Sequence, residues 1–420
     1  MTIPQIPQTL PPFIELITSK VTPNYKPAVA CAAFAPLTTY MDGLQFRYID
    51  NTLREATFMN VLIATTGAGK NCVEEPIRHL LAPVLESDAQ NRQREDDWKS
   101  ECEATSANAR RPQRPKGLTI QCVASDMTYA AWVKRLSEAN GKYLYTNVSE
   151  IDDLMRLRTS TGRSAVYEMI LAAFDNAECG QERVGTASIS ARPRVRWAFN
   201  ASTTTQKGRR FFHGQTTTGA LSRVSLSTIE VDEFAEIPIY GDYDEAFDIQ
   251  LLGYIERLRQ TPRGEVLCPE AREFIRGLVT ETRENAAASR DRAYFELSKR
   301  AAVIAYLKAM TLYLLEGEWS TLIADFVQWS YEYDLWCKMQ FFGKEASREF
   351  DNEALDNVAL PSSVVKLSEL PQRFTREDYL ALRTAKGLSL KGDTTGTLRS
   401  WKARRLIMQI DDTTYEKLER

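Results

Sequence analysis

The sequence predicts an α/β fold, in which a parallel sheet with crossover helices is followed by a helical segment and a small C-terminal domain. Two observations carry this prediction. Residues 56–64 (ATFMNVLIA) are mostly apolar, as in a strand that is buried on both faces of a parallel sheet. Strand and helix patterns then alternate up to about residue 235, and helical patterns dominate after it.

Length and composition are typical of a multidomain globular protein. At 420 residues the chain is too long for one compact core. The hydrophobic fraction of 43% argues against wholesale disorder, and the net charge of −3 excludes a strong basic field over the whole chain. Seven scattered cysteines without a CxxC pair, together with only two histidines, indicate reduced thiols rather than a disulfide framework or a zinc site.

Neither a secretory signal nor a membrane span is expected. The first residues lack a basic start followed by an apolar run. No apolar stretch approaches the roughly 20 residues that a spanning helix needs. We therefore expect a cytoplasmic protein that has no membrane partner.

The patterns divide the chain into an N-terminal helical segment, a strand-rich core, a helical domain and a C-terminal domain, at residues 1–45, 46–235, 236–358 and 359–420. Core strands are expected at residues 46–49, 56–64, 118–123, 143–148 and 194–199. Core helices are expected at residues 70–85, 127–139 and 164–176. The helical domain is expected to be a bundle without chemistry of its own, with helices at residues 271–288, 295–316 and 320–342.

Residues 86–116 are a charged insertion or linker within the core. The first half fits a projecting charged helix. The second half contains two prolines and small polar residues, which is typical of a mobile loop.

The most informative residues, ATTGAGKN at positions 64–71, directly follow the apolar strand. The strand runs into a glycine-containing turn, and Gly69-Lys70 begins a helix. Backbone N–H groups of such a turn point at an anion, and the lysine ammonium reaches the β- and γ-phosphates of a nucleotide. The alternative is a plain glycine-containing turn with an exposed lysine. We predict a phosphate-binding loop (P-loop) for ATP, with contacts from Thr65, Thr66, Gly67, Ala68, Gly69, Lys70, Asn71 and Cys72.

Two positions of this loop depart from the usual pattern. Ala64 stands in place of the first glycine, and Asn71 stands where a serine or threonine hydroxyl normally binds Mg²⁺. The carbonyl oxygen of Asn71 can bind the ion, but less predictably. ATP and Mg²⁺ are the expected cofactors.

A second strand, at residues 143–148, ends in Ser149-Glu150. Glu150 is placed to act as the general base or the water-orienting carboxylate of an ATPase. Ser149 occupies the position where an aspartate is expected, and its hydroxyl is a weak, uncharged contact for Mg²⁺ or its water. The alternative is that the acidic cluster only complements a helix dipole.

Polar and basic residues farther along are candidates for the same site. Asn200 is expected at the tip of the strand beside the phosphate loop, where it senses the nucleotide or is a plain turn residue. Arg223 precedes a short apolar strand and is either an arginine finger for a neighbouring subunit or a surface charge. Arg209 and Arg210 lie in a basic-aromatic loop that either contacts nucleic acid or is a solvated turn with two core phenylalanines.

The C-terminal residues resemble a winged helix. Thr375 and nearby acidic residues mark a helix start, a second helix is expected at residues 393–402, and a hairpin is expected across Asp411-Asp412. Such a domain either binds DNA or docks protein. The DNA contacts are expected on or beside the second helix, from Lys391, Arg399, Lys402, Arg404 and Arg405.

The order of these motifs resembles the helicase-like P-loop ATPases of the AAA+ and superfamily 3 kind, and more narrowly the primase-helicase-associated ATPases of bacterial mobile elements. The matching segments are ATTGAGKN, LYTNVSEID, FNAST and GALSRVSL, at residues 64–71, 144–152, 199–203 and 219–226. The resemblance implies a P-loop NTPase core in which Lys70 binds phosphate, Glu150 activates water, Asn200 senses the nucleotide and Arg223 is the finger.

The same resemblance implies a homo-oligomer, such as a hexameric ring, that acts on DNA in replication or excision of a mobile element, with element-encoded replication or recombination proteins as partners. Because Asn71 and Ser149 depart from the pattern, an alternative is a nucleotide-gated DNA-binding initiator or excision factor with weak or no ATP hydrolysis. A further alternative is a scaffold whose P-loop fold has lost its ligand.

Overall fold

The computed structural model describes residues 2–106, 109–157, 164–182, 189–215, 219–230, 237–289, 291–357, 367–385, 396–403 and 406–418. The chain forms two compact units, Met1–Ser347 and Arg348–Arg420. In the described ranges no helix is long and apolar enough to cross a membrane.

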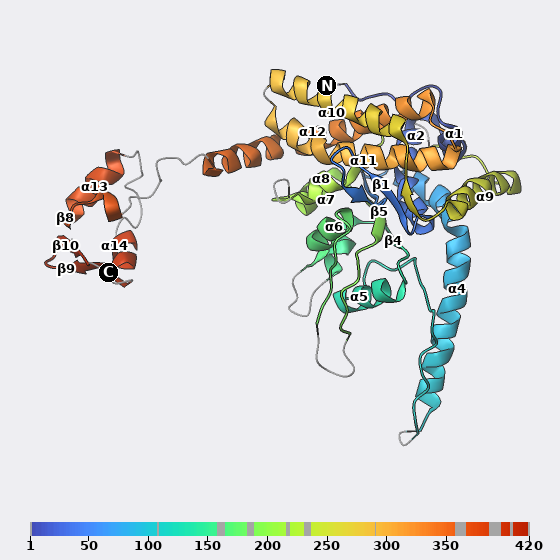
Figure 1. Cartoon of the computed structure of the whole chain (residues 1–420), viewed down its shortest axis with the longest axis horizontal. Coiled ribbons are helices and arrows are strands. Elements are labelled where there is room, and N and C mark those ends of the chain that lie inside the picture. Colours follow the sequence, from blue (N-terminus) through green and yellow to red (C-terminus); the bar gives the residue numbers. More distant parts are fainter. Residues whose placement is uncertain are drawn as a thin grey trace. The chain divides into compact units, whose positions relative to one another are not determined.

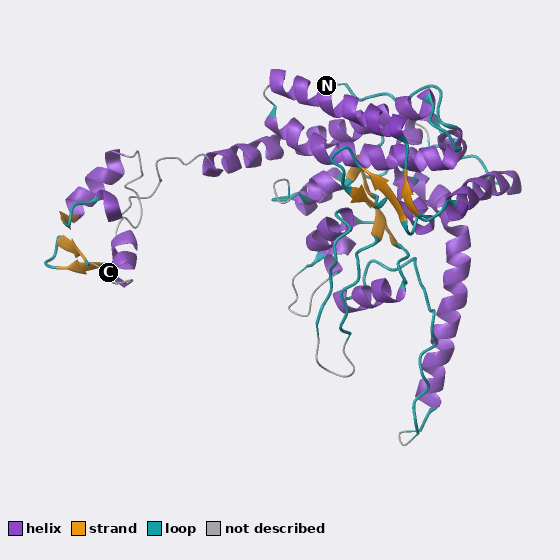
Figure 2. Ribbon diagram, viewed as in Figure 1, coloured by secondary structure: helices purple, strands orange, loops and turns teal. Residues whose placement is uncertain are grey.

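The centre of the first unit is a parallel sheet with the strand order β4-β5-β3-β6 (Figures 1 and 2). The strands are β3 (Met59–Ile63), β4 (Leu144–Val148), β5 (Trp197–Thr203) and β6 (Ser225–Ser227). A parallel bridge from Cys122 to Tyr145 extends the sheet beyond β4. The prediction of an α/β fold with a parallel sheet is therefore confirmed.

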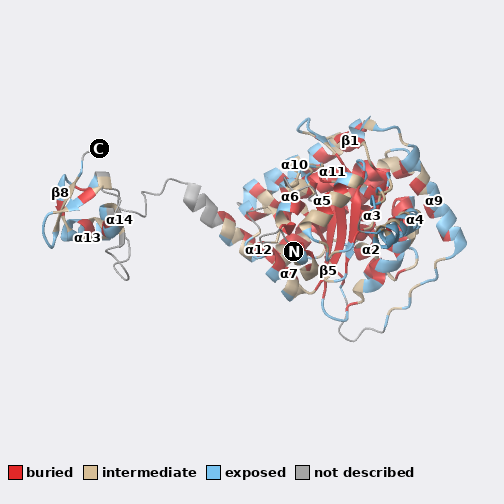
Figure 3. Cartoon of the chain, turned by 90° about the horizontal axis from the view of Figure 1, so that it is seen from below, coloured by how far each residue is buried: buried red, intermediate tan, exposed pale blue. Residues whose placement is uncertain are grey.

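The strands form because helices cover both faces of the sheet. All five residues of β3 are buried, as the apolar run at 56–64 indicates, and Figure 3 shows this burial along the central strands. Trp197 of β5 packs edge-on against Trp132 of α5 (Tyr129–Glu138), with ring centroids 5.9 Å apart. Ile63 pairs with Thr203, so β3 and β5 end together at the carboxyl edge of the sheet.

The N-terminal segment is helical, as expected, and belongs to the same core. It contains α1 (Pro12–Thr18), η1 (Pro23–Tyr25), α2 (Lys26–Ala32), α3 (Phe34–Leu37) and η2 (Thr38–Tyr40). Prolines occupy the first turns of α1, η1 and α2, where their missing N–H loses no helical hydrogen bond. Every residue from 28 to 41 is buried.

The helical segment after residue 236 also packs into the first unit, so it is not a separate domain. Its long helices are α9 (Glu245–Gln260), α10 (Pro269–Ser289), α11 (Arg292–Glu316) and α12 (Thr321–Asn357). Figure 1 shows α10, α11 and α12 together on one side of the strands. A small sheet ties the segment to the N-terminal part, in the order β2 (Leu53–Arg54), β1 (Leu44–Arg47) and β7 (Gly264–Val266).

Helix α12 closes the open edge of β6. The amide of Leu226 donates to Oδ1 of Asp334 at 2.7 Å, and the amide of Thr228 donates to the hydroxyl of Tyr333 at 3.1 Å. The buried ammonium of Lys338 pairs with Oδ2 of Asp334 at 2.7 Å. These bonds satisfy strand groups that would otherwise remain unpaired at the edge of the sheet.

The charged insertion at 86–116 is a helix with a packed return segment. Helix α4 runs without interruption from Glu74 to Ala104, whereas the sequence predicted an end at residue 85. Figure 1 shows α4 extending away from the strands. Nε1 of Trp98 donates to the carbonyl of Pro112 at 3.1 Å, which fixes the return segment against the helix. The projecting charged helix predicted for the first half is present, and the described residues of the second half form a loop that packs on it.

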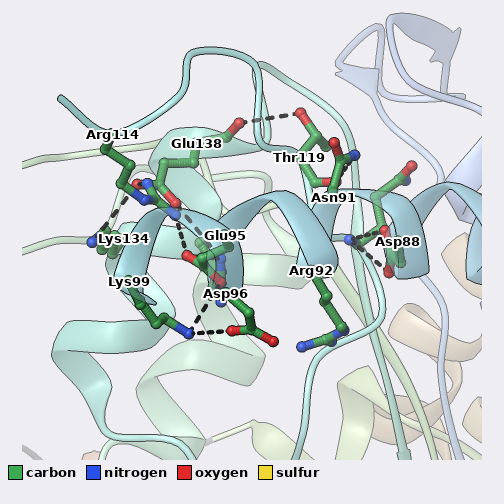
Figure 4. A network of polar contacts seen from close by, with 12 residues as sticks. Asp88, Asn91, Arg92, Glu95, Asp96, Lys99, Arg114, Thr119, Lys134 and Glu138 are labelled. Carbon is green, nitrogen blue, oxygen red and sulfur yellow. Dashed lines mark hydrogen bonds and ion pairs between the residues drawn. The ribbon is translucent and has the colours of Figure 1, made fainter. Parts of the chain in front are cut away.

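Buried carboxylates hold this insertion together (Figure 4). Glu95 pairs with Arg114 of the return segment, and its Oε2 lies 2.7 Å from Arg135 of α5. Asp88 accepts hydrogen bonds from the amides of Gln121 and Cys122. The partners are far away in sequence, so no local pattern could predict them.

The second unit combines two helices with a three-stranded antiparallel sheet of order β8-β10-β9. Its elements are η5 (Leu367–Glu369), β8 (Arg373–Thr375), α13 (Arg376–Ala385), α14 (Gly396–Ala403), β9 (Ile407–Gln409) and β10 (Thr414–Lys417). Thr375 and Asp378 exchange reciprocal capping bonds at the start of α13. The core is Leu370, Phe374, Tyr379, Leu398 and Ile407.

Candidate nucleotide-binding site

The loop after β3 leaves the carboxyl edge of the sheet through two glycines in left-handed conformations. Gly67 has a φ of 80° and Gly69 a φ of 72°, which side chains rarely tolerate. The amide of Ala64 donates to the carbonyl of Thr203 at 3.1 Å, and the amide of Ala68 donates to that of Thr65 at 3.3 Å. The loop is thus anchored to the end of β5 and closed by a turn.

Gly69 is also required by space. A Cβ at this position would lie 3.0 Å from the hydroxyl of Tyr25 and 3.2 Å from that of Tyr240. The chain then enters the short helix η3 (Lys70–Val73), and α4 follows. The sequence predicted that the helix begins at Lys70. In the structure a single turn of 3-10 helix begins there, and α4 begins at Glu74.

Lys70 lies at the centre of a group of charges. Its ammonium donates to the carbonyl of Thr65 at 2.9 Å. Partial burial lowers the pKa of Lys70, the nearby carboxylate of Glu150 opposes this shift, and the nearby ammonium of Lys207 adds to it. Nζ of Lys207 lies 3.0 Å from Oε2 of Glu150, and their side chains are 40% and 42% exposed. One carboxylate and two ammonium groups therefore gather beside the glycine loop.

The ends of neighbouring strands position these groups. Glu150 stands between β4 and the short helix η4 (Ile151–Arg156). Lys207 lies in the first turn of α7 (Thr205–Phe212), because Thr204 caps this helix and its hydroxyl accepts from the amide of Lys207 at 3.4 Å. Sequence reasoning placed Lys207 in the basic-aromatic segment with Arg209 and Arg210 and did not select it for the nucleotide site. A capping threonine followed by helix-forming residues was the signal that could have indicated it.

The expected nucleotide contacts differ in exposure. Ala68 and Cys72 have buried side chains, so only their backbone can face a ligand. Lys70 and Gly69 are half-buried, while the exposed members are Thr65, Thr66, Gly67 and Asn71.

The two expected magnesium contacts, Asn71 and Ser149, are both exposed. In the part of the chain that the structure describes, no group of three or more His, Cys, Asp or Glu side chains is arranged to hold a metal ion. Mg²⁺ binding stays a prediction that depends on these two side chains.

Asn200 is not at the tip of its strand. Strand β5 continues to Thr203, and Asn200 pairs with Asn60 in the interior of the sheet. The buried amide of Asn200 donates to the hydroxyl of Tyr145 at 3.0 Å and accepts from Asn60 at 3.1 Å. Because the strand is longer than predicted, Thr203 and Thr204 occupy the edge where a nucleotide sensor was expected. The role of Asn200 is to satisfy polar groups inside the core.

Arg223, at the end of α8 (Ala220–Arg223), is engaged within its own unit. One guanidinium nitrogen lies 2.8 Å from Oδ2 of Asp175, and the group stacks over Phe174 at the end of α6 (Val166–Phe174). The side chain is only 11% exposed. Of the two readings of Arg223, the surface charge does not fit this burial, and the finger role stays a prediction that requires the side chain to leave Asp175.

Arg209 and Arg210 lie on helix α7 and not on a loop. Phe211 and Phe212 are buried, so the alternative of two core phenylalanines is the correct one for these rings. Nε of Arg209 donates to the carbonyl of Phe341 at 3.2 Å, and Arg210 pairs with Asp152 at 2.5 Å. Contact of these arginines with DNA remains a prediction.

The basic residues of the second unit are placed in part. Arg399 and Lys402 are exposed on α14, and Nζ of Lys402 donates to Oε1 of Gln409 at 2.7 Å. The other candidates lie outside the described residues, namely Lys391, Arg404 and Arg405.

No family model matches the chain, and no curated protein matches it in sequence. The chain is an α/β protein in which a glycine loop, two lysines and a glutamate meet at the carboxyl edge of a parallel sheet.

Proposed function

We propose that the chain binds ATP at the loop of residues 64–71 and acts on DNA through its C-terminal unit. One observation carries the proposal: Lys70 follows a glycine loop at the end of a buried parallel strand, with Glu150 and Lys207 beside it. Crevices outside the carboxyl ends of parallel strands are the usual ligand sites of open α/β sheets.

The charges at this edge favour a polyanion. Lys70 and Lys207 contribute two positive charges against the single negative charge of Glu150. Loop amides and the amino end of the following helices add partial positive charge. The triphosphate of a nucleotide has the charge and length to occupy such an edge, with Mg²⁺ as its companion ion.

The C-terminal unit supports the DNA part of the proposal. A strand, two helices and a hairpin follow one another, and β10 lies between β8 and β9. This order resembles that of a winged helix and supports the proposal that α14 is the recognition helix. Arg399 and Lys402 are exposed on that helix, where phosphate contacts occur.

Together these features support an oligomeric, helicase-like ATPase of the AAA+ kind, which serves replication or excision of a mobile element with other element-encoded proteins. A second candidate is a nucleotide-gated DNA-binding factor with weak turnover. The ion pair with Lys207 favours the second candidate, because it engages the carboxylate that would activate water. Asn71 and Ser149 favour it also, since neither brings a charge to Mg²⁺.

Calorimetric ATP titrations of the full chain with Mg²⁺ test the proposal. Lys70→Ala is expected to lower the affinity by about 100-fold, because a charge-assisted contact to phosphate is lost. Lys99→Ala is the matched control, since Lys99 is an exposed lysine that pairs with Asp96 on α4. ATP binding that does not depend on Lys70, or no ATP binding by the wild type, contradicts the proposal.

ATP hydrolysis, measured with and without DNA, separates the two candidates. DNA-stimulated hydrolysis that Lys70→Ala abolishes supports the ATPase, and ATP binding without turnover supports the gated factor.

DNA binding is tested with the double variant Arg399→Ala, Lys402→Ala. The slope of log affinity against log salt concentration is expected to fall by about 1.8, since each lost phosphate contact removes about 0.9. An unchanged slope and affinity mean that this helix docks protein instead.

A further inference from the structure

A cavity of about 530 Å³ adjoins the phosphate loop and begins at the residue after Lys70. Asn71 and Cys72 of η3 form one wall, His79 of α4 a second, and Tyr240 and Tyr243 a third. The volume lies within the roughly 300–1,000 Å³ that is typical of small-molecule sites. The proposed nucleotide function uses the loop, but so far it leaves this cavity unexplained.

Tyr240 separates the cavity from the loop. Its hydroxyl lies 3.2 Å from the place of a Cβ on Gly69, so the cavity wall directly touches the phosphate loop. Among the described residues, no group hydrogen-bonds this buried hydroxyl. Burial raises the pKa of Tyr240, so the group remains a neutral donor. A buried donor without a protein partner is uncommon, and a water, an ion or a ligand atom can satisfy it.

Tyr243 adds a supported aromatic ring. It stacks on His79, with ring centroids 4.7 Å apart and planes inclined by 21°, and it packs edge-on against Phe247. His79 is fixed in turn, because its Nδ1 lies 2.6 Å from Oδ1 of Asp248. The amide of Gly241 donates to the carbonyl of Lys20 at 2.7 Å, which holds the tyrosine segment in place.

The charge of the cavity differs in sign from that of the loop edge. Among the described residues that line the cavity, Glu74, Glu75 and Asp242 bring carboxylates, and Arg78, which pairs with Glu75, is the one fixed cation. Phosphates are repelled there. Hydroxyl and amino groups are suitable occupants, because carboxylates accept their hydrogen bonds.

These observations describe a ligand with an anionic end and a neutral end that is aromatic and rich in hydrogen-bond donors. We propose that the cavity beside Tyr240 and Tyr243 holds the nucleoside half of the nucleotide whose phosphates bind at Lys70. The inference rests on the proposed function and adds the part of the ligand that the loop alone does not recognise. Ribose hydroxyls and base amino groups face the carboxylates, and the base packs against the tyrosines.

The test compares ATP with inorganic tripolyphosphate, each titrated with Mg²⁺ into the full chain by calorimetry. Wild type is expected to bind ATP at least tenfold more tightly than tripolyphosphate. Tyr243→Ala is expected to lower ATP affinity about tenfold, the usual effect of losing one base–aromatic contact, and to leave tripolyphosphate binding unchanged. Tyr243→Phe retains the ring and is expected to bind ATP as wild type does. The matched control is Tyr294→Ala, at a half-buried tyrosine of α11 away from the cavity.

A second variant keeps the test valid if Tyr243→Ala fails to fold. Tyr240→Phe removes only the hydroxyl without a partner and is expected to weaken ATP about threefold and tripolyphosphate not at all. Equal wild-type affinity for ATP and tripolyphosphate overturns the inference. The inference is also overturned if Tyr243→Ala and Tyr240→Phe both bind ATP with wild-type affinity. An equal loss of affinity for ATP and for tripolyphosphate overturns it as well. Tripolyphosphate binding that does not depend on Lys70 overturns the proposed function itself, so the two failures are distinguishable.

Discussion

Two clusters of charge in this chain use a glutamate in opposite ways. The side chain of Glu95, in the insertion, is 8% exposed and is held by Arg114 and Arg135. The side chain of Glu150, beside the phosphate loop, is 42% exposed and pairs with Lys207. Burial alone would raise the pKa of Glu95, but hydrogen bonds from Arg135 and Arg114 lower it to about 2.

The difference in burial and pairing assigns a structural role to one cluster and a ligand-binding role to the other. The Glu95 cluster joins helix α4, the return segment and α5, and its carboxylate is saturated by arginines. The Glu150 cluster is open to solvent and adjoins Lys70. A saturated, buried ion pair holds elements together, whereas an open one can exchange its partner for a ligand.

The largest expected effect is on stability at the buried cluster. Glu95→Ala leaves Arg114 and Arg135 with Glu138 as their remaining carboxylate partner and is expected to lower the free energy of unfolding by about 2 kcal/mol. Glu150→Ala is the matched control and is expected to cost less than about 1 kcal/mol, because exposed pairs contribute little. Urea denaturation measures both. Equal losses would remove the distinction between the clusters.

The buried cluster should also make stability depend on pH. The pKa of Glu95 is lowered in the folded state from 4.5 to about 2. Its contribution is therefore complete above about pH 5 and is lost as the pH falls toward 2. Unfolding free energies measured from pH 6 to pH 3 should decline less steeply in Glu95→Gln than in wild type. Parallel curves would mean that this carboxyl is not perturbed.

Arg223 is an intermediate case. It has a single carboxylate partner, Asp175, and its side chain is largely buried. Arg223→Ala loses the bonds to Asp175 and Gly219 and is expected to cost about 1–2 kcal/mol in urea denaturation. ATP binding and any turnover, measured on folded protein, should remain within about twofold of wild type. Loss of turnover at unchanged stability would support the finger role.

The smallest effects concern the open cluster, where the two partners should act with opposite sign. Glu150→Gln removes a negative charge near Lys70 and is expected to tighten ATP binding about threefold. Lys207→Gln removes a positive charge and is expected to weaken it by a similar factor. Both shifts should shrink when salt is raised, because exposed charges are screened. Shifts of the same sign in calorimetry would show that the pair acts through shape and not through charge.

Sequence patterns predicted what depends on neighbours along the chain. The apolar run at 56–64 indicated β3, and Thr375 with Asp378 indicated the start of α13. Patterns failed where distant partners decide. The first half of the charged stretch was predicted as a projecting helix, but its packing through the pairs of Glu95 with Arg114 and Arg135 is not visible in any local pattern.

The candidate site shows the same limit. Lys70 and Glu150 follow from strand ends that are visible in the sequence. Asn200 lies inside the sheet because β5 continues for three more residues, Ala201, Ser202 and Thr203, which are small and mostly polar and therefore resemble a turn. Lys207 became a candidate for the nucleotide site only because α7 begins directly after that strand and turns the side chain toward Glu150.

Hydrogen–deuterium exchange of the loop amides tests the central claim most directly. Peptides that cover residues 64–73 should exchange more slowly when ATP and Mg²⁺ are added to the wild type, because the backbone N–H groups bond phosphate oxygens. In Lys70→Ala the same slowing should require about 100-fold more ATP. Unchanged exchange in the wild type at saturating ATP would contradict the account, since the loop would then not be the place where the nucleotide binds.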